Sequence, residues 1–187
     1  MVSAGSLLRA RGISGTSIAE VMEGAGMTVG GFYAHFPNKS TLVAEVLRGA
    51  LEDSLGLMRK GAGEKRGAEW VKAAALLYLS RHHRDHPEEG CPLPAVLGEL
   101  PRGGRAPREA LAEGLADIAG EMASHLEEAG AQAPGDEALA LLAVMAGGLS
   151  LARALKDTSL SDRVLRACRA HVERCVSGPG PRPAGKR

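Results

Sequence analysis

The sequence predicts an all-α fold with two domains. Apolar residues recur at helical spacing in several stretches, breaks rich in glycine and proline separate those stretches, and residues able to cap a helix precede several of them. We expect a small N-terminal domain of three helices over residues 1–48 and a larger helical domain over residues 49–176. A Pro- and Gly-rich tail, residues 177–187, is expected to be disordered.

Composition narrows the class of protein. With 187 residues, 44% of them hydrophobic, the chain is long enough to build a substantial core. It shows neither a run of about 18 apolar residues, as a membrane span requires, nor a signal peptide, so we expect a cytoplasmic protein with no membrane partner. The three cysteines are an odd number outside any CxxC motif, which argues against a disulfide framework and a zinc ribbon. No cofactor and no metal are expected.

The first well-marked helix is predicted over about residues 17–23. Thr16 or Ser17 can cap its start, and Glu20 follows at the spacing that a capping box requires. Glycines at positions 24 and 26 then favour a tight turn that ends the helix.

A second short helix is predicted over about residues 28–34, with Thr28 as its N-cap. We expect Met27, Phe32 and Phe36 to face the interior. The residues left for an outer face are Thr28, Val29, Gly30, Tyr33 and Ala34. Gly30 and Gly31 each cost a helix roughly 1 kcal/mol, which favours a site where another backbone, such as that of DNA, approaches closely. Two short helices joined by a tight turn predict a DNA-binding helix-turn-helix.

A third helix is predicted to begin after Pro37, with Asn38 as its cap and Lys39 in its first turn. The free amides of a helix start and a lysine would together attract a phosphate. The apolar pattern continues for about twenty residues beyond Asn38, which predicts a connecting helix that ends near the glycine-rich break at residues 61–67.

These residues resemble the DNA-binding domain of the TetR/AcrR family of transcriptional regulators. The matching motifs cover roughly a sixth of the chain and are Thr16-Ser17-Ile18, Gly26-Met27-Thr28, Phe32-Tyr33-Ala34-His35-Phe36 and Lys39. The resemblance implies an all-helical homodimer that binds a palindromic operator in double-stranded DNA, responds to a small-molecule effector and catalyses no reaction. Repression is the expected mode of regulation.

The resemblance also implies roles for individual residues. Phosphates would be held by Thr28, Tyr33, His35 and Lys39. Val29, Gly30 and Ala34 would meet or approach base edges. Thr16 and Ser17, at the start of the preceding helix, complete the predicted DNA contacts. Members of the family carry about ten more residues before this point, so the first helix, over residues 2–11, is expected to be abbreviated.

The charge of the predicted DNA-binding domain is low. Residues 1–48 hold four cations, Arg9, Arg11, Lys39 and Arg48, and three anions, Glu20, Glu23 and Glu45, which leaves a net charge of +1. Because affinity for phosphates comes from Lys and Arg, we expect modest affinity with a shallow dependence on salt.

Four further helical segments are predicted over about residues 68–84, 94–100, 107–129 and 160–176, and another begins near Asp136. The helix of residues 107–129 carries a stripe at spacings of 4, 3, 4 and 4: Leu111, Leu115, Ile118, Met122 and Leu126. Residues 138–152 hold no charge, so that helix is expected to be buried on every side, centrally or between subunits. The last two helices resemble the family's four-helix dimer interface.

An effector pocket is expected among the helices of the larger domain. Its predicted lining is Trp70, Leu77, Tyr78, Leu97, Leu115, Ile118, Met122 and Met145. Few aromatic residues and no evident buried charge pair suggest a small or aliphatic effector, although the same residues would also serve as ordinary core.

Three alternatives remain open at this point. His82, His86 and Cys91 have spacing compatible with a metal-dependent hydrolase, although histidines also suit an exposed helix end. Cys91 alone, at the start of a short helix, suggests a sensor of oxidants or electrophiles, against the simpler interpretation of a buried inert thiol. A helical dimer that binds only protein partners is the third.

Overall fold

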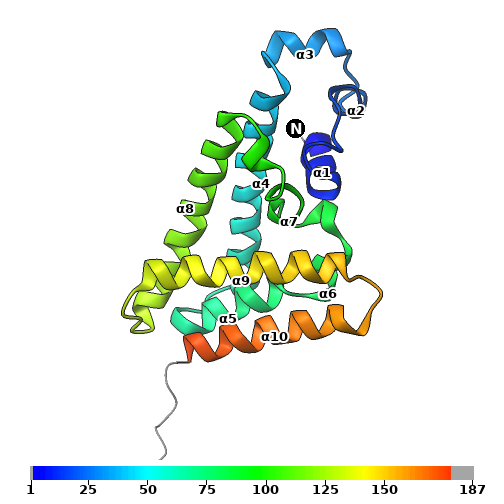
Figure 1. The fold of residues 1–187 in the computed structure, drawn as a ribbon. Coiled ribbons are helices and arrows are strands. Elements are labelled where there is room, and N and C mark those ends of the chain that lie inside the picture. The colour runs from blue at the N-terminus through cyan, green and yellow to red at the C-terminus, as the bar shows by residue number, and fades with distance from the viewer. Residues whose placement is uncertain (1, 178–187) are drawn as a thin grey trace, which may run out of the picture. The chain divides into compact units, whose positions relative to one another are not determined.

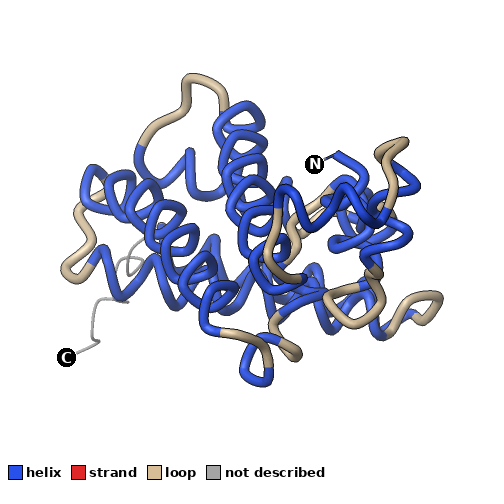
Figure 2. Tube along the Cα trace, turned by 90° about the horizontal axis from the view of Figure 1, so that it is seen from above, coloured by secondary structure: helices blue, strands red, loops and turns tan. Residues whose placement is uncertain are grey.

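The computed structural model describes residues 2–177, which lie mostly in helices and contain no strand (Figures 1 and 2). The all-α prediction is confirmed. In chain order the elements are α1 (Val2–Arg11), α2 (Ile18–Gly24), α3 (Val29–His35), α4 (Lys39–Ala62), α5 (Gly67–Tyr78), α6 (Arg81–Asp85), η1 (Pro87–Glu89), α7 (Leu93–Val96), η2 (Leu100–Arg102), α8 (Arg105–Glu128), α9 (Pro134–Ala154) and α10 (Ser159–Val176). The predicted tail, from residue 178 onward, lies outside the described residues.

Packing divides the chain into two compact units. Unit 1 contains the residues up to Leu57 together with His82–Ile118, and unit 2 contains Met58–Arg81 and the residues from Ala119 onward. Both α4 and α8 contribute residues to each unit. The two units are defined by contacts between residues. The predicted boundary at residue 48 separates a DNA-binding domain from a ligand-binding domain, so that division stays a prediction.

The start of α2 is fixed by the predicted capping box. Ser17 Oγ accepts a hydrogen bond from the Glu20 backbone N–H at 3.1 Å, and the Glu20 carboxylate accepts one from the Ser17 N–H at 3.1 Å. At the other end Gly26 has a φ of +67°, a left-handed conformation that favours glycine. The turn after α2 is therefore the tight one that the glycines predict.

Side-chain caps also fix the next two helices. Thr28 Oγ1 accepts from the Gly31 N–H at 3.3 Å, and Asn38 Oδ1 accepts from the Thr41 N–H at 3.0 Å. Local signals therefore place the starts of α2, α3 and α4 within one or two residues of their predicted positions.

Phe32 anchors α3 in the core of unit 1. It is 1% exposed, and its ring packs against Phe36 with centroids 5.6 Å apart. The prediction that Met27 also faces inward is wrong, because Met27 is 44% exposed. Met27 lies in the turn before the Thr28 cap, where helical periodicity does not apply, and five positions correspond to about 140° around a helix.

Glu99 clamps the loop between α1 and α2. Its carboxylate accepts hydrogen bonds from the Ile13 N–H and the Ser14 N–H, both at 2.8 Å, and from the Ser14 hydroxyl. Gly12, with a φ of +72°, lies so close that an added Cβ would collide with Glu99 and the Ala95 carbonyl. Burial alone would raise the pKa of Glu99, but the Ser14 and Ile13 hydrogen bonds and the charge of Lys39 outweigh it and lower that pKa.

Unit 2 is built on α5, α9 and α10, and α9 and α10 run side by side (Figure 1). Gly148 of α9 permits this close packing, since a Cβ there would approach Cys168 Sγ to 2.5 Å. The Trp70 and His125 rings stack with centroids 4.4 Å apart, and Arg81 pairs with Asp162 at 2.5 Å.

The predicted helix over residues 68–84 is interrupted, which corrects that prediction. α5 ends at Tyr78, and α6 begins only at Arg81. Leu79 at the break is fully buried, and its carbonyl accepts a hydrogen bond from Arg169 Nε of α10 at 3.0 Å. The Leu79 carbonyl thus accepts from a side chain ninety positions away in place of a backbone N–H of a continuing helix.

Within one chain the uncharged helix is not buried on every side, so its predicted central burial is wrong, whereas burial between subunits stays a prediction. In α9, Leu139 is 54% exposed and Leu151 is 57% exposed. By length and mean hydropathy this helix could span a membrane, contrary to the expectation from apolar runs, but a core helix passes the same test. Part of its apolar surface is therefore not covered by any of residues 2–177.

We expect Glu99→Gln to lower the free energy of unfolding by roughly 1–3 kcal/mol at pH 7, because two amides lose a charged acceptor. Since folding lowers the pKa of Glu99 below its ordinary 4.5, this stabilisation is present above that value. It disappears as the pH falls through the folded-state pKa. Thermal unfolding of parent and variant from pH 7 to pH 3 measures the difference.

Glu113→Gln is the matched control. Glu113 pairs with Arg48 at 2.8 Å on the surface, where both side chains are exposed, so its loss should destabilise the protein much less than Glu99→Gln does. A Glu99→Gln effect that stays constant down to pH 3 would contradict the clamp.

Candidate nucleic-acid interface

The outer face of α3 is exposed as predicted. Tyr33 is 62% exposed and Val29 46% exposed. Thr28, Gly30, Ala34 and His35 are exposed as well. Phe32 alone among the helix's residues is buried. The helix therefore presents a continuous exposed surface without Lys, Arg, Asp or Glu side chains.

Gly30 has no packing requirement within the protein. A Cβ at this position would meet nothing closer than Thr28 Oγ1 at 3.9 Å, and its φ is not positive. Glycine here nevertheless weakens the helix by about 1 kcal/mol relative to alanine. Nothing in residues 2–177 requires glycine at this position, so close approach by DNA to this backbone stays the prediction made from the sequence.

Thr16 and Ser17 differ in their availability. Thr16 is 4% exposed, and its hydroxyl donates to the Gly12 carbonyl at 2.7 Å. This geometry does not favour the DNA contact predicted for Thr16. Ser17 is exposed at the start of α2 and bonds to Glu20, whose pKa is lowered first by the Ser17 side chain and further by Arg11.

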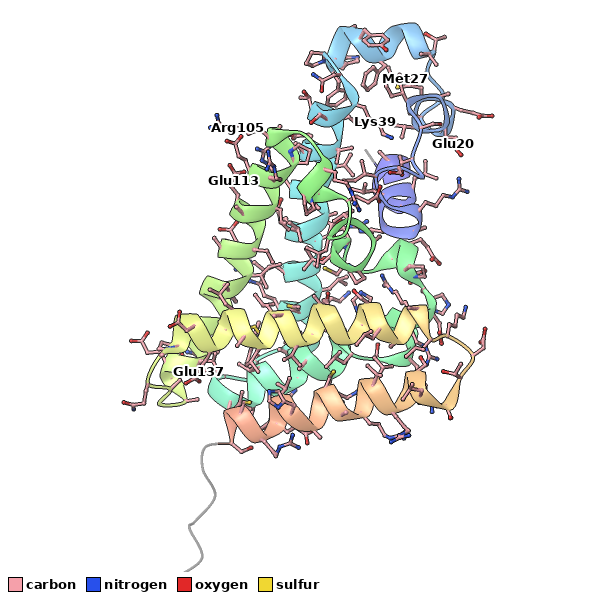
Figure 3. All side chains as sticks on the ribbon, in the orientation of Figure 1. Glu20, Met27, Lys39, Arg105, Glu113 and Glu137 are labelled. Carbon is pink, nitrogen blue, oxygen red and sulfur yellow. The ribbon has the colours of Figure 1, made fainter. Side chains whose placement is uncertain are left out.

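Lys39 is engaged within unit 1 (Figure 3). Its Nζ donates to the Ile13 carbonyl at 2.7 Å, and its charge acts on the nearby Glu99. An ammonium has three donors, so a contact with phosphate is compatible with this hydrogen bond. The structure thus links the predicted phosphate contact at the start of α4 to the loop that Glu99 holds.

The other cations of residues 1–48 are also in ion pairs. Arg9 pairs with Asp53 at 2.7 Å, Arg11 with Glu20 at 2.9 Å, and Arg48 with Glu113 at 2.8 Å. The positive charge that helix-turn-helix residues offer to DNA is consequently small.

The predicted effector-pocket residues divide by burial. Trp70, Tyr78, Ile118, Met122 and Met145 are buried and Leu115 is half-buried, whereas Leu77 and Leu97 are 42% and 39% exposed. A cavity of about 440 Å³ lies in unit 2, but its lining contains none of the eight: Leu76, Ser80, Arg81, Asp162, Leu165, Arg166 and Arg169. The pocket stays a prediction.

The three residues of the metal-dependent hydrolase alternative, His82, His86 and Cys91, make other contacts. His82 and His86 stack with ring centroids 4.3 Å apart, and His82 Nε2 lies 3.3 Å from Glu89. Cys91 is 2% exposed, and its backbone N–H donates to His83 Nε2 at 2.8 Å. Within residues 2–177 no three His, Cys, Asp or Glu side chains are grouped to hold a metal. Burial also gives a reagent little access to Cys91, so its sensor role stays a prediction without support from this geometry.

Two family models match the chain. "Bacterial regulatory proteins, tetR family" matches residues 2–46, and "Tetracyclin repressor-like, C-terminal domain" matches residues 67–168. The HTH-type transcriptional repressor KstR2 of Rhodococcus jostii (strain RHA1) is 37% identical over 57 residues. That alignment spans 30% of this chain and only 28% of KstR2.

Solved structures share the fold over nearly the whole chain. The reduced form of Escherichia coli NemR has a TM-score of 0.77 at 20% identity, with 91% of each chain covered. A TetR transcriptional regulator of Chloroflexus aurantiacus J-10-FL has a TM-score of 0.73 at 22% identity, covering 95% of this chain and 92% of its own. These structures show the fold, and the two family models confirm the family predicted from the sequence. Members of that family are transcription factors, not enzymes, so the enzyme alternative is set aside. The chain belongs to the TetR family and is a DNA-binding transcriptional regulator.

Proposed function

We propose that this regulator is a homodimeric repressor that places two copies of α3 in successive major grooves of a palindromic operator and is released by a small effector. The observation that carries the proposal is the outer face of α3, where Gly30 lies in open space between exposed polar and small residues. The name of KstR2, a repressor, supports the mode of regulation.

Recognition on this face uses few polar groups. The Thr28 hydroxyl can donate to a base or phosphate, and Val29 can contact a thymine methyl group. Gly30 and Ala34 add no donors, but they allow the helix backbone to approach the DNA. Specificity therefore rests partly on DNA shape and deformability.

The second copy of the chain is expected on the exposed side of α9. Leu139, Ala143, Gly147 and Leu151 recur every four residues, are exposed and carry no charge. Leu160, at the start of α10, is 45% exposed. A matching face on a second copy would bury this surface across a two-fold axis.

The effector is expected to bind among the eight predicted pocket residues and to be small or aliphatic. Its binding would favour a dimer geometry whose helices no longer match the groove spacing, which is a shift between populated states. We place the regulator in the cytoplasm, in keeping with its family.

Tyr33→Phe tests the DNA-binding face, because the variant keeps the ring that meets Phe32 edge-on, with centroids 5.0 Å apart, and removes only the hydroxyl. A hydrogen bond to a charged phosphate is worth about 1.5–3 kcal/mol, so affinity for a duplex from the gene's upstream region should fall roughly tenfold or more. Gly30→Ala should also weaken binding while it stabilises the free protein by roughly 0.5–1 kcal/mol. Fluorescence anisotropy and thermal unfolding measure the two effects.

Leu57→Ala, at an exposed position on α4, is the control and should bind like the parent protein. Unchanged affinity in both Tyr33→Phe and Gly30→Ala would mean that α3 does not meet DNA.

Leu151→Glu tests the proposed dimer face. Burying unpaired carboxylates between subunits costs several kcal/mol, and each 1.4 kcal/mol is a factor of ten. The dimer dissociation constant should therefore rise at least about a hundredfold in sedimentation experiments, with loss of operator binding. Leu57→Glu should leave the dimer intact. A dimeric Leu151→Glu protein would place the interface elsewhere.

A further inference from the structure

A short basic segment joins η2 to α8 in unit 1. Residues 102–108 hold Arg102, Arg105 and Arg108 and no acidic residue. We call this stretch the basic segment. It belongs to the same compact unit as α3 and the first part of α4, although it lies more than sixty positions further along the chain.

The basic segment lies beside the start of α4. A Cβ on Gly104 would collide with Ser40 Oγ and would lie 3.3 Å from Ser40 Cβ. Ser40 follows Lys39 in the first turn of α4, where the positive end of the helix dipole favours an anion. The segment is therefore next to the edge of the proposed DNA-binding surface.

The arginines of this segment are more available than those of residues 1–48. The Arg105 side chain is 87% exposed and projects outward from the start of α8 (Figure 3). Its ion pair with Glu109, at 2.6 Å, is on the surface, where such pairs contribute little, so a phosphate can replace Glu109. Arg102 donates to the neutral Gly98 carbonyl at 3.1 Å, and Arg108 is exposed.

We propose that the basic segment is an auxiliary contact to the DNA backbone, in which Arg105 and Arg108 bind phosphates flanking those near the start of α4. The proposal rests on the proposed function. Arginine suits this role because its planar guanidinium donates two parallel hydrogen bonds to a phosphate. The contact would add to the low net charge of the helix-turn-helix, where Arg9 is largely covered beside Asp53 and Lys39 donates to the Ile13 carbonyl.

The test is the dependence of DNA affinity on salt for Arg105→Ala and Arg108→Ala. Each lost phosphate contact should reduce the slope of log affinity against log salt by about one, hence by about two for each arginine in a dimer. The operator and an unrelated duplex of equal length should weaken by similar factors, because backbone contacts carry no sequence information. Arg105→Lys, which keeps the charge, should restore most of the slope.

Lys60→Ala combined with Lys156→Ala is the control, since it removes two exposed positive charges from unit 2. Slopes that match the parent in Arg105→Ala and Arg108→Ala, with Tyr33→Phe still defective, would overturn this inference and leave the proposed function standing. A slope that falls equally in the lysine control, or is not restored by Arg105→Lys, would also overturn it. If the parent protein binds neither duplex, both proposals fail.

Discussion

The burial of Phe32 is the constraint on which the DNA-binding surface depends. α3 has seven residues, far too few for an isolated helix to be stable in water. One fully buried aromatic side chain contributes about 1.5–3 kcal/mol, and the Thr28 cap contributes roughly 1 kcal/mol more. Because Phe32 is the buried residue of α3, the identity of the exposed side chains is not set by packing in the core. The helix can therefore carry the glycines and small residues that close contact with DNA requires, and its orientation follows from one ring rather than from a broad apolar stripe.

Features fixed by neighbouring residues could be predicted from the sequence. The capping box of Ser17 and Glu20, the Thr28 cap and the Asn38 cap each depend on residues three positions apart, and the structure has them all. Contacts distant in sequence could not be predicted. Glu99 is one carboxylate in a turn-rich interval, and nothing local shows that its partners lie 85 positions earlier. The break at Leu79 has the same origin, because its partner Arg169 lies on the last helix.

Apolar surface is a further case where sequence alone is ambiguous. The absence of charge from α9 predicted complete burial, centrally or between subunits, and residues 2–177 cover only part of that helix. An uncharged helix does not distinguish burial inside one chain from burial between two. The predicted pocket has the same ambiguity: Met122 and Met145 are fully buried, as core residues and pocket residues both can be, whereas Leu77 is well exposed.

The central claim is that two copies of α3 occupy successive major grooves of one operator. Methylation protection of the upstream DNA tests it most directly, since dimethyl sulfate attacks guanine N7 in the major groove and adenine N3 in the minor groove. The account predicts two groups of protected guanines, related by the symmetry of the operator and centred about one helical turn, or a whole number of turns, apart. Protection of a single group, or of minor-groove adenines alone, would contradict it.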